Sequence, residues 1–237
     1  MPAKYAYSDL TVVLPTMNEA SGVASLISNI LKSFKGARVI IVDDGSTDGT
    51  VELVRKISHN KAEVKLIDRK ALHKRRGLTA SVVEGIMAAR SKFVVVMDAD
   101  GQHPYQLIRP VMKGLQEGDD LVICTRTSVR NWPASRVIIS KVMTGIGRAV
   151  LIARVRPHPR DIMSGFFGVR RRLFAEIYSS NRSRFVGEGF KVLFDFLKSL
   201  DNGRRILEIP YIFSDRKNGA SKAKLIHGVY LIKSFLT

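Results

Sequence analysis

Val94-Val95-Val96-Met97-Asp98-Ala99-Asp100-Gly101-Gln102-His103-Pro104 is an apolar run that ends at two carboxylates one residue apart. Such a short run, bounded by turn residues, is typical of a buried parallel strand, and ligands collect at the carboxyl ends of these strands. The carboxylates of Asp98 and Asp100 and the amide of Gln102 suit Mg²⁺ or Mn²⁺, whose shell substrate phosphates usually complete. The stretch indicates a metal site and a phosphorylated substrate, although by itself it also fits an ordinary polar turn.

Strand-like and helix-like segments alternate on both sides of this stretch. Strands are expected at residues 11–14, 38–42, 64–67, 93–97 and 121–124, and helices at 20–34, 50–58, 79–90 and 104–117. This alternation predicts an α/β fold with a mixed, mostly parallel sheet flanked by helices. No repeat or linker interrupts the 237 residues, so we expect a single domain over residues 1–215 and an extension over residues 216–237.

The composition limits the kinds of partner, disulfide and membrane contact that the chain can have. Its 39 Lys and Arg residues against 21 Asp and Glu give a formal charge of +18, which favours a polyanionic partner. The single cysteine, Cys124, lies in an apolar run and excludes an intrachain disulfide framework. Since no secretory signal pattern and no uncharged apolar stretch of about 18 residues is present, membrane contact is expected to be peripheral.

Two segments of the second half have an amphipathic helical pattern. Residues 133–154 carry Arg136, Lys141, Arg148 and Arg154 among apolar side chains, and residues 223–237 repeat this character. Either helix could lie on a membrane surface or pack on the core of the domain itself.

The first two expected strands also end in polar residues. Leu14-Pro15-Thr16-Met17-Asn18-Glu19 closes the first, and Val42-Asp43-Asp44-Gly45-Ser46-Thr47-Asp48-Gly49-Thr50 closes the second. Asp43 and Asp44 could accept hydrogen bonds from a base or a ribose, and Gly45 would let the backbone approach the ligand closely. Each motif alone is a common turn, but beside the Asp98 stretch they predict a nucleotide pocket.

These motifs, in this order, resemble the inverting family 2 glycosyltransferases with the Rossmann-like GT-A fold. The similarity continues through Arg126, Trp132, Arg136 and Ser140, then Asp161, Ser164, Gly165 and Phe166, and finally Arg216-Lys-Asn-Gly219-Ala-Ser221-Lys222. Within the family the chain looks most like the polyprenyl-phosphate (dolichol-phosphate) mannose synthases. It departs from them at Met17, where Tyr is usual, at Gly77-Leu78-Thr79-Ala80, where a second Gly is common, and in a short loop over residues 126–132.

For the donor, the resemblance implies GDP-mannose, with UDP-glucose as the alternative. The residues implied to bind the donor nucleotide are Pro15, Thr16, Glu19, Val42, Asp43, Asp44, Asp98 and Ala99, with Arg216 and Lys222 closing over the diphosphate. Asp98, Asp100 and Gln102 would hold the divalent metal, and Asp100 would be catalytic. A positioned cation stabilises the charge that builds on the departing diphosphate.

For the acceptor, the resemblance implies dolichyl or another polyprenyl phosphate, held by Arg126, Arg136 and Ser140, which would be catalytic together with Asp100. A monophosphate is already largely ionised at neutral pH and therefore needs no general base. Trp132, Arg136 and Ser140 follow at helical spacing, which is also compatible with a solvated helix face. A hydroxyl acceptor predicts an acidic base followed by an Arg-Trp type motif, and the sequence has no such pair after residue 130.

Three further expectations concern single residues and location. His103 is expected to orient the turn before Pro104 rather than to bind metal, and Glu188 is a candidate for contact with the donor sugar or with a helix start. The enzyme would act at the cytoplasmic face of an anionic membrane and supply polyprenyl-phosphate mannose for glycosylation, and transmembrane helices could follow Thr237 in a longer protein. A nucleic-acid-binding module would fit the charge but leaves Asp43, Asp44, Asp98 and Asp100 unexplained.

Overall fold

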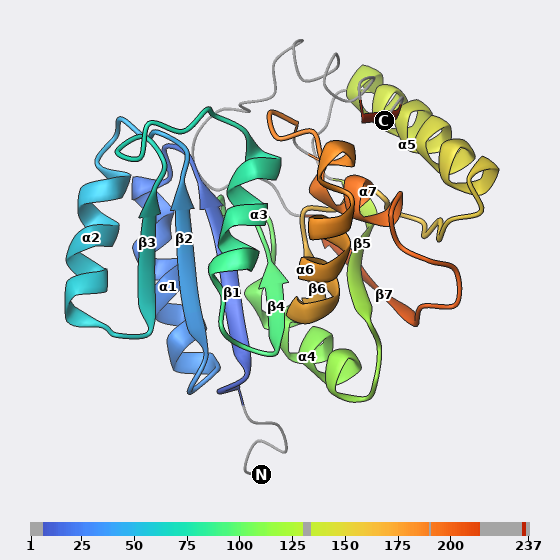
Figure 1. The fold of residues 1–237 in the computed structure, drawn as a ribbon. Coiled ribbons are helices and arrows are strands. Elements are labelled where there is room, and N and C mark those ends of the chain that lie inside the picture. Colours follow the sequence, from blue (N-terminus) through green and yellow to red (C-terminus); the bar gives the residue numbers. More distant parts are fainter. Residues whose placement is uncertain (1–6, 130–133, 190, 214–233, 236–237) are drawn as a thin grey trace.

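The backbone forms one seven-stranded sheet with the order β3-β2-β1-β4-β6-β5-β7 (Figure 1). The computed structural model describes residues 7–129, 134–189, 191–213 and 234–235, without the side chains of residues 129 and 134–136. Only β6 runs antiparallel to its neighbours in this sheet, so the predicted mostly parallel sheet is confirmed. The strands are β1 (Leu10–Thr16), β2 (Arg38–Asp43), β3 (Val64–Asp68), β4 (Phe93–Val96), β5 (Leu121–Val129), β6 (Phe167–Arg170) and β7 (Ile206–Phe213).

Helices cover both faces of the sheet (Figure 1). One face carries α3 (Leu78–Ala88), α6 (Arg171–Ser180) and α7 (Val192–Leu197). The other carries α1 (Ala20–Ser33) and α4 (Ile108–Gln116), with α2 (Thr50–Asn60) packed beside α1. A short 3-10 turn, Tyr105–Leu107, precedes α4, and another, Arg182–Arg184, follows α6.

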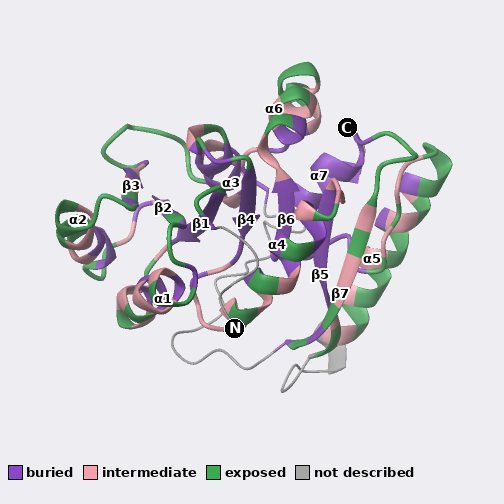
Figure 2. Cartoon of the chain, turned by 90° about the horizontal axis from the view of Figure 1, so that it is seen from below, coloured by how far each residue is buried: buried purple, intermediate pink, exposed green. Residues whose placement is uncertain are grey.

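The apolar side chains of the strands form two cores, one on each face. Figure 2 shows the central strands in the colour of buried residues. All seven residues of β1 and all four of β4 are buried, because both strands lie inside the sheet with helices above and below. This burial on both faces explains why these strands read as continuous apolar runs rather than as alternating patterns.

The structure adds strands and helices that the sequence pattern did not indicate. β5 continues to Val129 instead of ending at Cys124, because β7 pairs alongside it as far as Val129 and Phe213. Arg126, which follows the strand expected at residues 121–124, therefore lies inside β5. The elements β6, α6, α7 and β7 were not predicted; β6 and α7 are only four and six residues long, too short for a clear period.

Helix α5 (Ala134–Ala153) confirms the helix expected over residues 133–154 and lies at the β7 end of the molecule (Figure 2). It exposes a row of apolar side chains that are 45% to 62% accessible: Ile138, Ile139, Val142, Ile146 and Ile152. In the described part of the chain, no helix is long and apolar enough to cross a membrane. The helix expected over residues 223–237 lies outside the described residues, except for Ser234 and Phe235.

Candidate functional site

The candidate site lies along the sheet edge where the parallel strands end (Figure 1). β1 ends at Thr16, which is level with Asp43 at the end of β2, and β4 runs parallel to β1 and leads into Asp98. Arg126 of β5 extends past the end of β4 on the same side. The three predicted motifs and Arg126 therefore meet at one edge, as expected for a ligand site in an open α/β sheet.

Asp98 and Asp100 are presented by a tight turn that His103 closes. The Asp98 N–H donates to His103 Nδ1 at 2.9 Å, and the Gln102 N–H donates to Asp100 Oδ1 at 3.0 Å. Because Nδ1 is the acceptor, a neutral His103 carries its proton on Nε2, which lies 3.8 Å from Asp98 Oδ2. His103 is buried and stacks on Phe166, and this burial lowers its pKa. The predicted role of His103 in orienting the turn is confirmed.

The residues present fit a divalent metal. Burial raises the pKa of Asp98, His103 opposes that shift, and the nearby charge of Asp100 raises the pKa further. A cation between the two carboxylates would relieve this repulsion. Among the described residues, no group of three or more His, Cys, Asp or Glu side chains could hold a metal unaided. A metal here would need other oxygens, such as those of a substrate diphosphate, which is usual for Mg²⁺.

Asp43 is fully buried, and both of its carboxylate oxygens accept hydrogen bonds from other residues of the protein. Oδ1 accepts the N–H groups of Gly45 and Ser46 at 3.0 and 2.8 Å, and Oδ2 accepts the hydroxyls of Thr16 and Ser46 at 2.9 and 2.5 Å. These four bonds match the four lone-pair positions of a carboxylate. Asp43 therefore shapes the loop that follows β2, and its direct contact with a nucleoside stays a prediction.

Asp44 is bound to a buried arginine that sequence reasoning did not identify. Arg69, 4% exposed, forms ion pairs with Asp44 and Glu84 and also donates to the carbonyl of Gly77. The Gly77 N–H donates to Asp44 Oδ2 at 2.7 Å. Burial raises the pKa of Asp44, while the Gly77 hydrogen bond and the charge of Arg69 oppose that shift. The network fixes the end of β2 against the start of α3.

Arg126 is held by a two-point ion pair with Asp161. Its Nε and Nη2 donate to Oδ2 and Oδ1 of Asp161 at 2.7 and 2.8 Å. Lys191 donates to the carbonyl of Met163 at 3.1 Å, and its positive charge favours the ionised forms of both Asp98 and Asp161. Two cations, Arg126 and Lys191, thus border the carboxylates of the candidate metal site.

A cavity of about 760 Å³ opens next to Arg126, between α5 and the paired strands β5 and β7. It brings together two of the predicted acceptor residues, Arg126 and Ser140. Its lining also includes Lys141, Arg148 and Arg160, with Asp161 and Glu208 as the acidic members. Four cationic side chains against two carboxylates favour an anionic occupant.

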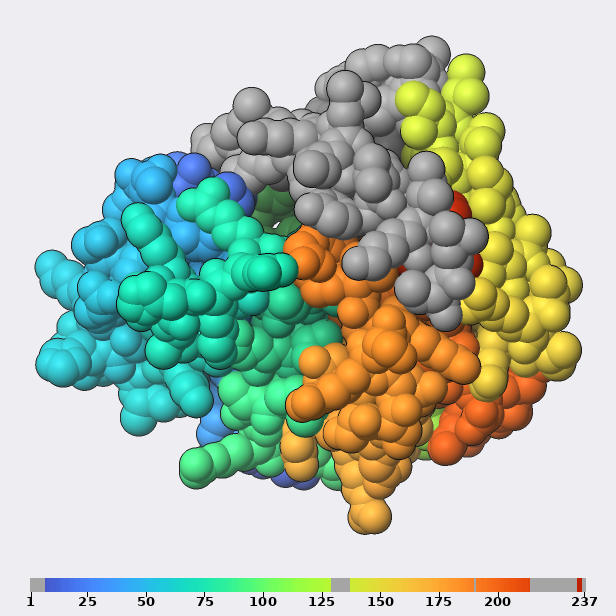
Figure 3. All heavy atoms as spheres, turned by 45° about the horizontal axis from the view of Figure 1, so that its top comes forward, coloured from blue at the N-terminus to red at the C-terminus, as the bar shows by residue number. Residues whose placement is uncertain are grey.

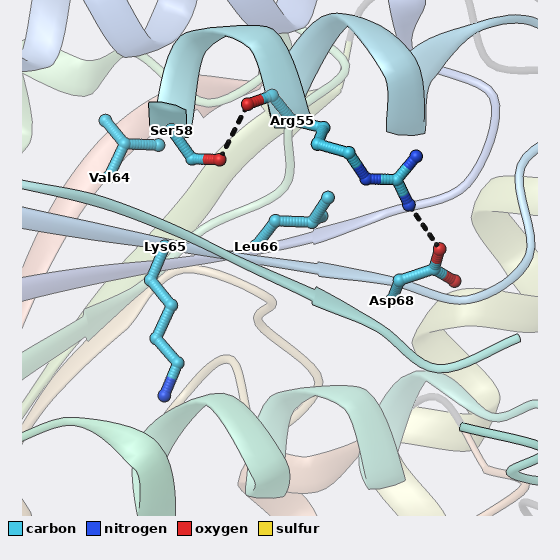
Figure 4. Close-up of a pocket in the computed structure, with 6 residues that line it drawn as sticks. All are labelled: Arg55, Ser58, Val64, Lys65, Leu66 and Asp68. Carbon is cyan, nitrogen blue, oxygen red and sulfur yellow. Dashed lines mark hydrogen bonds and ion pairs between the residues drawn. The ribbon is translucent and has the colours of Figure 1, made fainter. Parts of the chain in front are cut away.

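A second depression, of about 400 Å³, lies on the outer edge of the sheet between α2 and β3 (Figure 4). There Arg55 pairs with Asp68 at 3.1 Å, and the Ser58 hydroxyl donates to the Arg55 carbonyl. Lys65 points away from this pair in Figure 4. None of the predicted site residues lines this groove, so we do not regard it as the functional site.

Four of the predicted site residues cannot be placed. Arg216, Lys222 and Trp132 lie outside the described residues, and so does the side chain of Arg136, although its backbone belongs to α5. Pro15, Thr16, Glu19, Val42 and Ala99 lie at the strand-end edge with Asp43 and Asp98. Glu188 is partly buried in a loop that contacts α3.

Sequence reasoning missed Arg69, Lys191 and the cavity residues Arg160 and Glu208. Arg69 could have been suspected because it directly follows a strand, as the other site residues do. Lys191 and Glu208 carry no such signal, because their positions depend on β6, α7 and β7.

The sequence profile of Glycosyl transferase family 2 matches residues 11–178. The dolichol-phosphate mannosyltransferase of Pyrococcus furiosus is 34% identical over 224 residues, covering 91% of this chain and 59% of that protein. The dolichol-phosphate mannosyltransferase of Saccharomyces cerevisiae is 29% identical, covering 90% of this chain and 80% of that protein. The polyprenol monophosphomannose synthase of Mycolicibacterium smegmatis is 28% identical, with 89% and 79% covered.

Among solved structures, glucosyl-3-phosphoglycerate synthase from Mycobacterium tuberculosis has a similar fold. Its complex with Mn²⁺, UDP-glucose and phosphoglyceric acid superposes with a TM-score of 0.62 at 21% identity, covering 95% of this chain and 79% of that one. At this identity the likeness establishes the fold alone.

Proposed function

This chain belongs to glycosyl transferase family 2, and from that premise we propose that it transfers mannose from GDP-mannose to a polyprenyl phosphate with inversion at the anomeric carbon. The relatives from P. furiosus and S. cerevisiae are named for transfer of mannose to dolichol phosphate. The chain spans 59% of the length of the first, so activity, substrates and partners are proposed here for this chain.

The donor would lie along the strand-end edge. Pro15, Glu19 and the loop shaped by Asp43 would contact its nucleoside. Asp98, Asp100 and Gln102 would hold Mg²⁺ or Mn²⁺, which as a Lewis acid stabilises negative charge on the leaving nucleoside diphosphate. Support for the metal comes from the two adjacent carboxylates and from the Mn²⁺ bound with UDP-glucose in the M. tuberculosis enzyme.

The observation that carries the acceptor proposal is the charge of the cavity beside α5. Asp161 is engaged by Arg126, and Glu208 accepts the Thr125 hydroxyl at 2.7 Å and the Arg160 N–H at 3.1 Å. Both carboxylates are thus engaged by groups of the protein itself, whereas the cations suit a phosphate. A phosphate acceptor is already ionised and attacks without a base, so the protein has only to hold it in line behind the anomeric carbon.

The membrane contact proposed for this chain is peripheral and on the cytoplasmic face. The exposed apolar row of α5 could enter the interfacial region of an anionic leaflet while the Lys and Arg side chains contact its headgroups. This arrangement would bring the phosphate of a membrane-bound acceptor to the cavity that α5 borders.

The test is transfer of label from GDP-mannose, with UDP-glucose in parallel, into an organic-extractable polyprenyl phosphate, with Mn²⁺ or Mg²⁺ and then with chelator. Label from GDP-mannose that chelator abolishes is the expected result. Label from UDP-glucose instead would replace mannose by glucose in the proposal. No label from either donor, although metal-dependent donor binding persists, would contradict the acceptor assignment.

Two variants separate the roles of donor and acceptor residues. Asp100→Ala is expected to abolish metal-dependent donor binding, because one of two carboxylates is lost. Arg136→Ala is expected to keep the donor Kd within about twofold and to lower transfer about 100-fold, because a cation that positions the acceptor is lost. Arg55→Ala, in the groove of Figure 4, is the matched control and should transfer normally. Equal loss of donor binding in both site variants would contradict this division.

A further inference from the structure

A buried ion pair lies on the face of the sheet opposite α1 and α4, and none of the roles described above uses either of its side chains. Lys198, directly after α7, is 0% exposed, and Asp195 within α7 is 1% exposed. Lys198 Nζ lies 3.0 Å from Asp195 Oδ1 and donates to the carbonyls of Arg184 at 3.0 Å and of Ser234 at 2.6 Å. All three ammonium hydrogens therefore have partners, which a buried lysine requires.

The carboxylate of Asp195 makes a second bond to Ser234 and also bonds to Val186. Its Oδ1 accepts the hydroxyl of Ser234, and its Oδ2 accepts the Val186 N–H at 3.1 Å. Burial raises the pKa of Asp195 and lowers the pKa of Lys198, and the attraction between the two groups opposes both shifts. Asp195, Lys198 and Ser234, which we call the Lys198 junction, thus hold α7, the segment of residues 184–186 and residue 234 together.

Through Val186, the Lys198 junction is connected to the start of α3, near the residues proposed to bind the donor. Val186 begins the loop of residues 186–189, whose carbonyls at Gly187 and Gly189 accept the N–H groups of Ala80 and Thr79 at 3.0 and 2.9 Å. These bonds fix the loop on the first turn of α3, next to Gly77 and its hydrogen bond to Asp44. The position of Glu188 within this loop is set by these contacts.

Through Ser234 and the adjoining Phe235, the Lys198 junction is connected to α5. Phe235 follows Ser234, packs edge-on against Phe194 with ring centres 5.2 Å apart, and is 9% exposed. A Cβ on Gly147 of α5 would lie 3.2 Å from the Phe235 ring and 2.6 Å from Ile162 Cδ1, so α5 lies close against both side chains. The Arg154 guanidinium also donates to the Phe235 carbonyl at 3.4 Å. Figure 3 shows the red atoms of residues 234–235 against the yellow helix.

We infer that the Lys198 junction is a set of positioning residues that seats Phe235 beneath α5 and thereby sets the width of the acceptor cavity. Gly147 faces Phe235, while its neighbour Arg148 lines the cavity, so a shift of α5 on this seat moves the cavity wall. The buried charges fix the position of Ser234, because its hydroxyl must reach Asp195 and its carbonyl must reach Lys198. A purely apolar contact would not impose such fixed points. The kinetic part of this inference rests on the proposed function.

The test uses Phe235→Ala and, as a milder change, Ser234→Ala in the full chain. Phe235→Ala is expected to raise the acceptor KM about tenfold while the donor Kd stays within about twofold, because only the wall of the acceptor cavity loses its support. Ser234→Ala should act in the same direction and less strongly, since the carbonyl bond to Lys198 remains. Phe34→Ala is the matched control, because Phe34 is also a buried phenylalanine but directly follows α1 and belongs to the other core.

Amide hydrogen exchange gives a readout that does not depend on transfer. Phe235→Ala should speed exchange in α5 about tenfold or more and leave α1 unchanged, whereas Phe34→Ala should do the reverse. Unchanged exchange in α5 would overturn the inference even if the chain proved to transfer no sugar. Faster exchange in α5 with an unchanged acceptor KM would overturn the link to the cavity. If Phe34→Ala raised the acceptor KM equally, the effect would reflect general destabilisation, and the inference would likewise be overturned.

Discussion

At the scale of single residues, the Arg126–Asp161 pair shows how a charged group is fixed before substrate binds. Both side chains are mostly buried, at 16% and 9% exposed, and the two-point geometry fixes the plane of the guanidinium. Burial alone would raise the pKa of Asp161, but the hydrogen bonds and charge of Arg126 outweigh it and hold that pKa below its usual range. The ionised form is therefore stabilised by folding.

We expect Asp161→Asn to lower the free energy of unfolding by about 3 kcal/mol at pH 7, because it leaves Arg126 buried without its partner. A carboxyl whose pKa is depressed by folding stabilises the protein above its unfolded pKa of about 4, and this contribution is lost as the pH falls through the lower folded value. The difference in the free energy of unfolding between wild type and variant should therefore become smaller as the pH falls. Urea unfolding at a series of pH values measures this difference.

The control for this prediction is Asp201→Asn. Asp201 pairs with Arg156 but is 75% exposed, so its loss should change stability by no more than about 1 kcal/mol at any pH. A stability difference for Asp161→Asn that grew as the pH fell would contradict the assigned ionisation.

The local part of the site could be predicted from the sequence, and the rest depended on distant contacts. Asp98 and Asp100 follow an apolar strand directly, so their place at the sheet edge could be inferred from neighbouring residues. Arg69 could not be given its role, because its partners Asp44 and Glu84 lie 25 and 15 residues away. The saturation of Asp43 by four hydrogen bonds was likewise invisible, since the sequence does not show how its loop folds back.

At the scale of secondary structure elements, glycine lets the start of α3 approach the loop of residues 186–189. A Cβ on Gly77 would lie 2.1 Å from the carbonyl oxygen of Gly187 and 2.7 Å from Glu188 Cα, both of which are backbone atoms. The strict alternation in the first half made its elements predictable, whereas the short β6 and α7 could not be found. The loop that meets Gly77 belongs to that less regular half.

Gly77→Ala is expected to destabilise the protein by about 2 kcal/mol and to weaken donor binding, since the loop must move and the Gly77 bond to Asp44 moves with it. Gly145→Ala in α5 is the matched control: nothing lies within 4 Å of its added Cβ, so it should gain up to about 1 kcal/mol from helix propensity. Thermal unfolding and donor titration measure both effects. Normal donor affinity in Gly77→Ala would show that the donor site does not depend on this contact.

At the scale of the whole molecule, charge and an apolar helix face act together. The formal charge of +18 would attract an anionic surface from any side, and on the proposed membrane contact the apolar row of α5 would give the protein one preferred orientation. In Figure 3 this helix forms one margin of the molecule. The sequence predicted both features, because net charge and helical periodicity do not depend on tertiary contacts.

The double variant Ile139→Asp/Val142→Asp is expected to weaken binding to anionic vesicles at least about tenfold, because apolar burial is lost in addition to two units of charge. Leu72→Asp/Met87→Asp changes the net charge equally at exposed apolar residues elsewhere and should weaken binding less. Vesicle sedimentation at two salt concentrations measures both, and binding by both pairs should fall with added salt. If the two double variants lost vesicle binding to the same extent, charge alone would account for the binding of the protein to the vesicle surface.

The parallel pairing of β5 with β7 has a consequence for the order in which the protein is made. Leu121 lies beside Ile206, so the ladder joins residues about 85 positions apart, whereas β1 to β4 are complete by Val96. All residues of the β1, β2, β3 and β4 ladders are therefore present in a growing chain well before β7 has been translated. The cavity gains Glu208 and Pro210 only when β7 is added. A nascent chain arrested before residue 206 would contain the three strand-end motifs but would lack the β7 wall of the cavity proposed for the acceptor.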